Sequence, residues 1–307
     1  MSNEMQAGHS IELTVAREVS PNGYYLSDGV QDVLLPYIEV SGEVRVSDRL
    51  HVFLFHDDKG RLTATMKKPL ITMGTVALLA VADINDRLGC FLEMGLGRQL
   101  LLPYTDLPEL RSLWPQIGDE VYVMLDHDKQ GRMIAKLAGE KQFEKLVMPA
   151  PSTWRNTWLD ARVYKPLKQQ TFLIIPGGVT GWGVMAMLHE AERTQLLRLG
   201  EQVKVRVTYI REDGRVNVSM RPPKEIGREE DADRLLTFLY ERPNGAMPYS
   251  DETPADIILK RFNISKGAFK RALGKLMKEG LVYQDGSWSY LTDKGKEEKA
   301  VRSGQGE

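Results

Sequence analysis

The sequence lacks most features that mark secreted proteins, membrane proteins and disulfide-stabilised domains. Its only cysteine, Cys90, has no partner for an internal disulfide, and we expect it to be a small apolar core residue. The longest apolar run, residues 76–82, is too short to cross a bilayer. Residues 1–9 do not show the charged-then-apolar layout of a signal peptide. We therefore expect a cytoplasmic protein with no membrane partner.

The sequence also lacks an excess of charge of either sign. Its 41 lysines and arginines nearly balance its 42 aspartates and glutamates, so the formal net charge is −1. That balance excludes a protein that coats nucleic acid by bulk charge. Any nucleic-acid binding must come from local basic patches.

Patterns typical of metal sites, phosphate-binding loops and catalytic nucleophiles are missing as well. The five histidines show no short metal-ligand spacing. Residues 126–131 resemble the first half of a calcium loop, but Leu137 stands where that loop needs a glutamate, and a turn explains them. The glycine-rich residues 177–183 lack the Lys-Ser/Thr of a P-loop, which favours a loop with close backbone approach. We predict no catalytic residue, no metal and no cofactor.

What the sequence does contain is one pattern written three times, at residues 46–61, 117–132 and 199–215. Each copy is an alternating strand, a glycine-containing turn and a second alternating strand. In the first copy Val52 and Leu54 face one way while Phe53 and Phe55 face the other. This alternation predicts antiparallel strands with one buried face.

Looser repeats precede each copy and complete the strand count. In the first repeat, residues 23–26 are followed by a second short run at residues 34–37. The second repeat has the same arrangement at residues 89–92 and 101–104. A further alternating run lies before each of these pairs. Five short strands are the count of a small Greek-key barrel of the OB-fold type. We therefore predict barrels at residues 10–69, 70–139 and 154–222.

The pattern changes from strands to helices after residue 223. A helix over residues 229–242, a helix capped by Thr253 and a helix from Ser265 to Glu279 precede a hairpin that turns at Asp285-Gly286. This order predicts a winged helix-turn-helix at residues 228–292, followed by a frayed tail. The fold class is thus mostly β with a C-terminal α+β domain.

Exposed aromatics beside cations would allow such barrels to bind single strands by stacking bases and holding phosphates. Tyr25, Phe91 and Phe172 fall on the second strand of each repeat, and Arg132 and Arg215 open the fifth strand of two of them. Aromatics in strands are also common in cores, and an arginine after glycine is common at solvated hairpin tips. The sequence leaves both interpretations open.

The third copy resembles the RNA-binding repeat of ribosomal small-subunit protein one. The resemblance lies in residues 199–207 and 213–221, and His189 falls in the segment that leads that family into the helix before its fourth strand. In the first two copies Tyr37 and Tyr104 stand where that family usually has its histidine. This departure leaves RNA contact by the first two barrels open.

Three such barrels followed by a winged helix resemble the bacterial conserved virulence factor B family, from about residue 10 to residue 291. The resemblance implies an RNA-binding regulator whose third barrel and winged helix form most of the surface. Candidate RNA-binding residues on the third barrel are Phe172, His189, Lys204, Arg206, Arg215, Asn217 and Arg221. Weaker candidates on the first two barrels are Tyr25, Tyr37, Phe91, Tyr104 and Arg132.

The third helix of the winged domain adds a basic face. Its cations are Lys266, Lys270, Arg271, Lys275 and Lys278, and Phe269, Leu273, Leu276 and Met277 form the stripe expected to pack inward. Lysines on an exposed helix can also serve solubility alone. Because no Asn or Gln lies near the helix start, contact with the phosphate backbone is favoured over base reading.

These observations lead to one hypothesis and two rivals. The leading hypothesis is a non-enzymatic protein that binds single-stranded RNA through the third barrel and the winged helix. The first rival is a DNA-binding transcriptional regulator led by the winged helix. The second rival is a nuclease, which the lack of clustered carboxylates outside turns disfavours.

Overall fold

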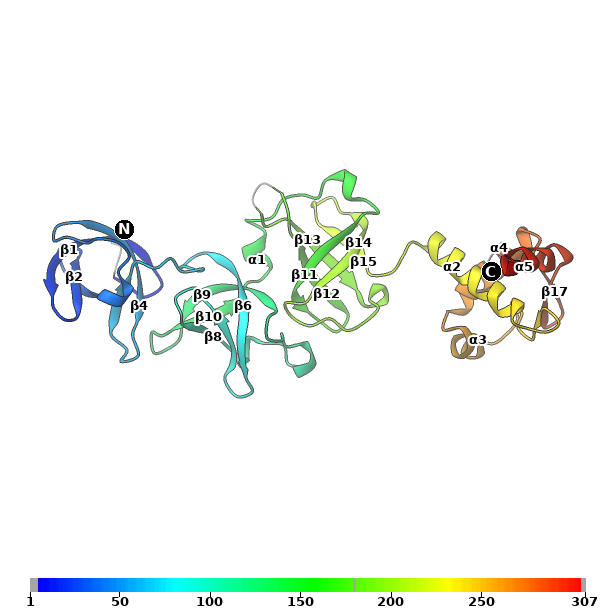
Figure 1. The fold of residues 1–307 in the computed structure, drawn as a ribbon, viewed down its shortest axis with the longest axis horizontal. Helices are drawn as coiled ribbons and strands as arrows, with labels where there is room; N and C mark the ends of the chain where they lie inside the picture. The colour runs from blue at the N-terminus through cyan, green and yellow to red at the C-terminus, as the bar shows by residue number, and fades with distance from the viewer. Residues whose placement is uncertain (1–4, 179–180, 305–307) are drawn as a thin grey trace. The chain divides into compact units, whose positions relative to one another are not determined.

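The computed structural model describes residues 5–178 and 181–304, and it divides the chain into two compact units, residues 1–221 and 222–307. The first unit carries the barrels and the second the helical domain (Figure 1). In the described residues no helix is long and apolar enough to cross a membrane.

The first barrel is closed, with strand order β1-β2-β3-β5-β4. Parallel pairing of Leu34 in β3 with Thr63 in β5 closes it. Its strands are β1 (Ser10–Val19), β2 (Gly23–Ser27), β3 (Asp32–Pro36), β4 (Arg49–His56) and β5 (Leu62–Thr65), with the 3-10 turn η1 (Tyr37–Glu39) after β3.

The second barrel repeats this order but stays open along one seam. Its sheet runs β10-β9-β6-β7-β8, and among the described residues no pairing joins β8 to β10. Its elements are β6 (Val76–Asn85), β7 (Gly89–Glu93), β8 (Gln99–Pro103), η2 (Tyr104–Asp106), η3 (Arg111–Leu113), β9 (Glu120–His127) and β10 (Met133–Leu137).

The third barrel is closed like the first, with order β11-β12-β13-β15-β14. Three parallel pairs between β13 and β15 close it, the central one being Met187 with Asn217. Its elements are α1 (Glu140–Phe143), η4 (Ser152–Trp154), β11 (Trp158–Pro166), β12 (Gln170–Ile175), β13 (Val184–His189), η5 (Glu190–Glu192), β14 (Gln202–Ile210) and β15 (Val216–Ser219).

The prediction of one buried face per strand is wrong for β4. Val52 and Leu54 lie in the core of the first barrel, as the alternation requires. Phe53 and Phe55 on the opposite face are also buried, at 2% and 3% exposure, because they pack into the core of the second barrel. The first barrel therefore supplies apolar side chains to the open second barrel.

The glycine-rich segment shows the close backbone approach that the sequence predicts. At Gly183, with φ of 78°, an added Cβ would lie 1.8 Å from the carbonyl oxygen of Ile175. Gly177 also forms an isolated bridge with Trp182. Residues 179–180 of this segment lie outside the described residues.

The second unit is a helical domain with a small sheet of order β16-β18-β17. Its elements are α2 (Lys224–Tyr240), β16 (Ala246–Met247), α3 (Ala255–Phe262), α4 (Lys266–Lys278), β17 (Val282–Asp285), β18 (Trp288–Leu291) and α5 (Asp293–Gly304). The tight turn at Asp285-Gly286 is confirmed, since Gly286 has φ of 55° between the two paired strands.

Four details of this unit differ from the sequence prediction. Helix α2 starts at Lys224 rather than residue 229, and helix α5 occupies the tail expected to fray. Pro254, not Thr253, is the N-cap of α3, because the Thr253 hydroxyl instead accepts from the backbone N–H of Ser250. Met277 is 42% exposed and lies outside the inward stripe.

The rest of the α4 prediction is confirmed. The Ser265 hydroxyl caps the helix by accepting from the backbone N–H of Ala268. Phe269, Leu273 and Leu276 are buried in the core that this unit forms around α2, α3 and α4. The opposite face of α4 is thereby held toward solvent.

Candidate nucleic-acid interface

One row of outward-facing side chains crosses all five strands of the third barrel. Strand pairing places Lys165 beside Phe172, Phe172 beside Met187, Met187 beside Asn217, and Asn217 beside Tyr209. Their strand neighbours Val163, Leu173, Ala186, Leu188 and Val218 point into the barrel core. We call Lys165, Phe172, Met187, Asn217 and Tyr209 the outer row.

The outer row combines a cation, two aromatic rings and an amide. Lys165 Nζ lies 5.9 Å from the centroid of the half-buried Phe172 ring. Tyr209 is 54% exposed. The side-chain oxygen of Asn217 is buried and has no hydrogen-bond partner among the described residues. His189 lies exposed on the same face as Phe172 and Met187, at the end of β13.

The outer row occupies only half of this face of the barrel. The other half is covered by side chains of α1 and of the second barrel. Ile174 and Met185, one alternation further along β12 and β13, are buried with Phe143 of α1 and Tyr122 of the second barrel. The Phe172 ring lies at the edge of this cluster, 6.2 Å from the Tyr164 ring. This packing holds Phe172 in place.

The corresponding rows of the other two barrels are interrupted. In the first barrel the row across the strands ends at Phe55, which is buried in the core of the second barrel. The other members of this row are Arg17, Tyr25, Leu34 and Thr63. In the second barrel Asp83 takes the place of the cation beside Phe91, and the row ends at the unpaired seam. Only the third barrel has a complete row of accessible side chains among the described residues.

Arg206 and Arg215, two of the arginines that the sequence nominates, are bound within the protein. Arg206 is 8% exposed and its guanidinium donates to the carbonyl oxygen of Arg221 and the side chain of Asn156. Arg215 forms ion pairs with Glu140 and Glu144 of the α1 region, and the Glu140 hydrogen bond raises its pKa. We leave both out of the proposed interface, because Arg206 is buried with its guanidinium bonded to neutral oxygens and Arg215 is ion-paired.

Three further candidates on the third barrel, Arg221, Lys204 and His189, are exposed. Arg221 donates to the carbonyl oxygens of Ala191 and Arg193, at 3.0 and 3.1 Å, and so fixes the turn after His189. Lys204 lies exposed on β14, opposite Asp160 of β11 and away from the outer row. His189 Nδ1 accepts from the backbone N–H of Ala191 at 3.2 Å.

The weaker candidates on the first two barrels are spread apart. The Tyr37 hydroxyl donates to Glu18, which raises the pKa of Tyr37 to about 12. The Tyr25 ring lies under Arg17 at 4.5 Å, and Arg132 is paired with Asp128 at 2.7 Å. Phe91 is half-buried, whereas Tyr104 is 55% exposed.

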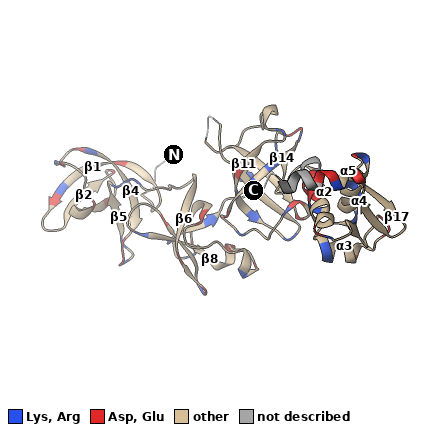
Figure 2. Ribbon diagram, turned by 45° about the vertical axis from the view of Figure 1, so that its right-hand side comes forward, with Lys and Arg blue, Asp and Glu red and all other residues tan. Residues whose placement is uncertain are grey.

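The basic helix α4 is partly neutralised. Lys270 lies 3.6 Å from Asp251, and Lys275 lies 3.6 Å from Glu229 and 3.7 Å from Glu279. The Lys266 ammonium donates to the carbonyl oxygen of Glu252 at 3.3 Å. Arg271 and Lys278 are exposed, and Lys278 has no ion pair with any described residue. Charges of both signs are interspersed along the ribbon (Figure 2).

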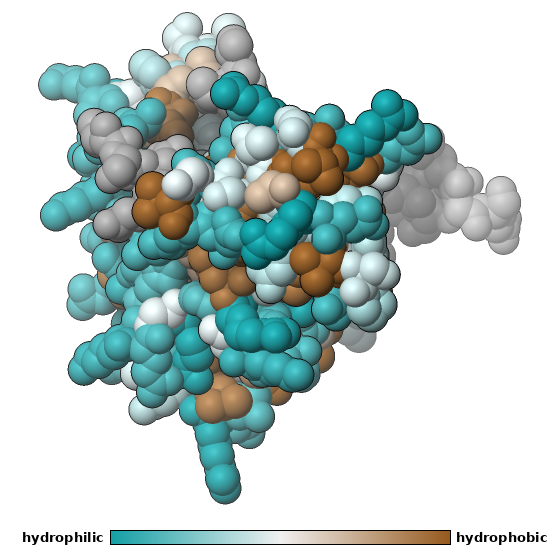
Figure 3. All heavy atoms as spheres, turned by 90° about the vertical axis from the view of Figure 1, so that its left-hand side faces the viewer, coloured by the Kyte–Doolittle hydropathy of each residue, from teal (hydrophilic) through white to brown (hydrophobic). Residues whose placement is uncertain are grey.

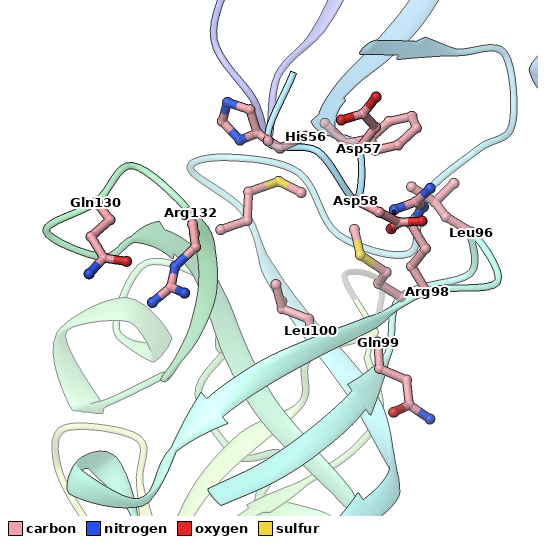
Figure 4. A pocket seen from close by; sticks show the side chains of 13 residues that line it. His56, Asp57, Asp58, Leu96, Arg98, Gln99, Leu100, Gln130 and Arg132 are labelled. Carbon is pink, nitrogen blue, oxygen red and sulfur yellow. Dashed lines mark hydrogen bonds and ion pairs between the residues drawn. The ribbon is translucent and has the colours of Figure 1, made fainter. Parts of the chain in front are cut away.

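A hollow in the first unit lies where the β4–β5 hairpin faces the open seam of the second barrel (Figure 4). Its charged groups are paired with each other or with near neighbours: Arg98 lies 2.9 Å from Asp58, and Asp57 binds Arg61 at 2.7 Å. The Arg98 guanidinium also covers the Phe55 ring at 4.7 Å. Such paired cations offer less to a phosphate than the outer row does.

No metal centre accompanies these features in the described residues, because no group of three or more His, Cys, Asp or Glu side chains converges there. The face of the molecule in Figure 3 is largely hydrophilic, with its apolar residues in small separate groups.

Sequence reasoning missed Lys165, Met187 and Tyr209 of the outer row. It also missed the exposed aromatics Tyr283 and Trp288 of the β17–β18 hairpin.

Four family models match the chain in succession. They are the S1 domain at residues 7–67, the CvfB first S1-like domain at residues 77–136, the second domain of virulence regulatory factor CvfB at residues 143–222, and the CvfB-like winged helix domain at residues 233–291. These matches agree with three barrels followed by a winged helix.

Similar proteins cover nearly the full chain. Protein YitL of Bacillus subtilis is 38% identical over 288 residues, which are 94% of each chain. Conserved virulence factor B of Staphylococcus epidermidis is 34% identical over 276 residues, 88% of this chain and 90% of that protein. A crystal structure of a multidomain protein with nucleic acid binding domains from Streptococcus pneumoniae is 31% identical, with a TM-score of 0.60, and covers 93% of this chain and 98% of that one.

Proposed function

Because this chain belongs to the conserved virulence factor B family, we propose that it is a non-enzymatic regulator that binds single-stranded RNA through its third barrel and winged helix. The outer row of the third barrel is the observation that carries the proposal. A cytoplasmic location, where RNA is available to it, is part of the same proposal.

The chemistry of the outer row suits an unpaired strand. Bases stack on exposed aromatic faces whatever their sequence, and Phe172 and Tyr209 offer rings at two points of the row. Lys165 adds a positive charge beside the Phe172 ring for a phosphate. The Asn217 side chain lies in the row between these two rings, next to Tyr209.

The winged helix contributes charge rather than base reading. Arg271 and Lys278 are exposed on α4, and the family model places a winged helix domain there. Weak contacts from two linked modules multiply in affinity, which suits a chain with a net charge of −1. Binding is therefore expected to weaken as salt rises.

The test compares two tyrosines of nearly equal exposure. Tyr209 in the outer row is 54% exposed and Tyr104 in the second barrel is 55% exposed. We expect Tyr209→Ala to weaken binding of a labelled single-stranded RNA about fivefold or more, since stacking on one base contributes about 1–3 kcal/mol. Tyr104→Ala is expected to leave the affinity unchanged, measured by fluorescence anisotropy. Equal effects of the two changes would contradict the assignment to the third barrel.

A DNA-binding regulator led by the winged helix is the second candidate, and the exposed cations of α4 favour it. The same titrations with duplex DNA separate the two functions. Tighter binding to the duplex, lost when the chain is ended at Arg221, would support the DNA-binding regulator. Retained RNA binding by residues 1–221 would support the barrel.

A further inference from the structure

Three aromatic side chains form a ladder on the outer face of the β17–β18 hairpin. Cross-strand pairing places Tyr283 opposite Tyr290, and Trp288 lies two residues before Tyr290 on the same face. The Tyr283 and Tyr290 rings are 5.3 Å apart with an interplanar angle of 20°. The Trp288 and Tyr290 rings are 6.3 Å apart with an angle of 25°. We call Tyr283, Tyr290 and Trp288 the wing ladder.

The core of this unit does not use the wing ladder. The inward face of the hairpin carries Val282 and Leu291, which are buried in the core, and Ser289, whose hydroxyl donates to the carbonyl oxygen of Tyr249 at 2.7 Å. On the outward face Tyr283 is 48% exposed and Trp288 is 43% exposed. Large aromatics gathered on a small solvent-facing hairpin mark a binding surface more often than a structural one.

The geometry of the ladder selects flat ligands. Tyr290 has two near-parallel neighbouring rings, and the larger exposed ring surface belongs to Tyr283 and Trp288. A flat base can stack on either of these exposed rings. Bases inside a duplex are already stacked on both faces, so an unpaired strand is the nucleic acid that this surface fits.

Both lysines and acidic residues flank the hairpin, and the lysines lie toward α4. Lys278 ends α4, four residues before β17 begins, and the Lys294 ammonium donates to the carbonyl oxygen of Glu279 at 2.8 Å. Two lysines thus lie where α4 meets the hairpin. Asp285 at the turn carries the opposite charge beside Trp288, so phosphates are favoured at the α4 end of the ladder.

We propose that the wing is a separate stacking site for single-stranded RNA, with bases stacked on Tyr283 and Trp288 and phosphates held by Lys278 and Lys294. The site rests on the RNA-binding function proposed above, and it differs from a phosphate-only role of α4. It would give the winged domain contact with bases through the hairpin rather than through its third helix.

The experiment uses the full chain and an RNA oligonucleotide that carries the fluorescent base 2-aminopurine, whose emission falls when it stacks. Trp288→Leu and Tyr283→Leu each remove a flat ring but keep an apolar side chain. Each is expected to reduce the quenching of 2-aminopurine and to weaken binding about fivefold or more. Trp288→Phe keeps a ring and is expected to restore most of the quenching.

Leu259→Ala is the matched control, since Leu259 is 56% exposed on α3 of the same unit and lies outside the ladder. Circular dichroism melting of each variant checks that the unit remains folded. If the wild type binds no RNA, both the proposed function and the wing site are wrong. If the wild type binds RNA and Tyr209→Ala weakens it while both wing changes leave affinity and quenching unaltered, only the wing site is wrong. The ladder would then be assigned to a protein partner.

Discussion

Arg198 donates two hydrogen bonds to Asp119, from Nε at 2.8 Å and from Nη2 at 3.0 Å. Asp119 is the third residue of the second copy of the repeated segment, and Glu201, its equivalent in the third copy, lies 3.2 Å from the same guanidinium. The backbone N–H of Leu199 also donates to the carbonyl oxygen of Leu113. Equivalent acidic residues of two repeats are therefore joined through one arginine.

We expect Arg198→Ala to lower the free energy of unfolding of the barrel unit by about 1–3 kcal/mol, because it removes the cation that pairs with both of these partly buried carboxylates. Urea denaturation of the variant measures the loss. Arg49→Ala is the control, since Arg49 pairs with Glu12 at 3.2 Å while both side chains are largely exposed. The control is expected to change stability by at most about 1 kcal/mol. Similar losses in both variants would contradict a structural role for Arg198.

Phe53 links the stability of the first two barrels. Its ring is 2% exposed and belongs to the core of the second barrel although β4 is a strand of the first. Phe53→Ala is expected to cost about 3–5 kcal/mol. Hydrogen exchange should then show lower amide protection in β6 to β10 as well as in β4. His51→Ala, at an exposed position of the same strand, is expected to leave that protection unchanged. Loss of protection in the first barrel alone would contradict shared packing.

Two glycines of one loop separate steric clash from backbone strain. Gly183 and Gly181 have φ of 78° and 76°, so alanine is strained at both. Only at Gly183 does the new Cβ meet backbone, 1.8 Å from the carbonyl oxygen of Ile175; at Gly181 no atom lies within 4 Å. Gly183→Ala should lower the melting temperature clearly more than Gly181→Ala does. Equal shifts would mean that the clash is relieved by movement of the loop.

Cys90 is expected to be chemically inert in the folded protein. It is fully buried, and desolvation raises the pKa of its thiol to about 11. At pH 8 the thiol is therefore protonated as well as shielded, and reaction with a disulfide reagent should be slow. Unfolding in guanidinium restores an ordinary thiol and should give fast, complete reaction. Fast labelling of the native protein would contradict the buried position.

The sequence was sufficient for the order of the elements but not for the surfaces that the barrels share. Alternation around residues 46–61, 117–132 and 199–215 predicted the strand pairs because that pattern is local. The burial of Phe53 and Phe55 depends on an open seam in another barrel, so no local pattern in β4 could reveal it.

The same limit explains the site residues. Arg206 and Arg215 look like free cations in the sequence, yet their partners Asn156 and Glu140 lie far away in the chain. Tyr209 joins the outer row through a bulge between β14 and β15, which the sequence does not show. The wing ladder could have been found, since Trp288 and Tyr290 alternate after a strong turn signal at Asp285-Gly286.

Ultraviolet crosslinking of the full chain to single-stranded RNA, followed by mapping of the crosslinked peptides, tests the central claim most directly. We expect crosslinks at Phe172 or Tyr209 of the third barrel and within the winged helix unit. The crosslinks in the third barrel should be lost in Tyr209→Ala and retained in Tyr104→Ala. Crosslinks confined to residues 10–139 would contradict the central claim.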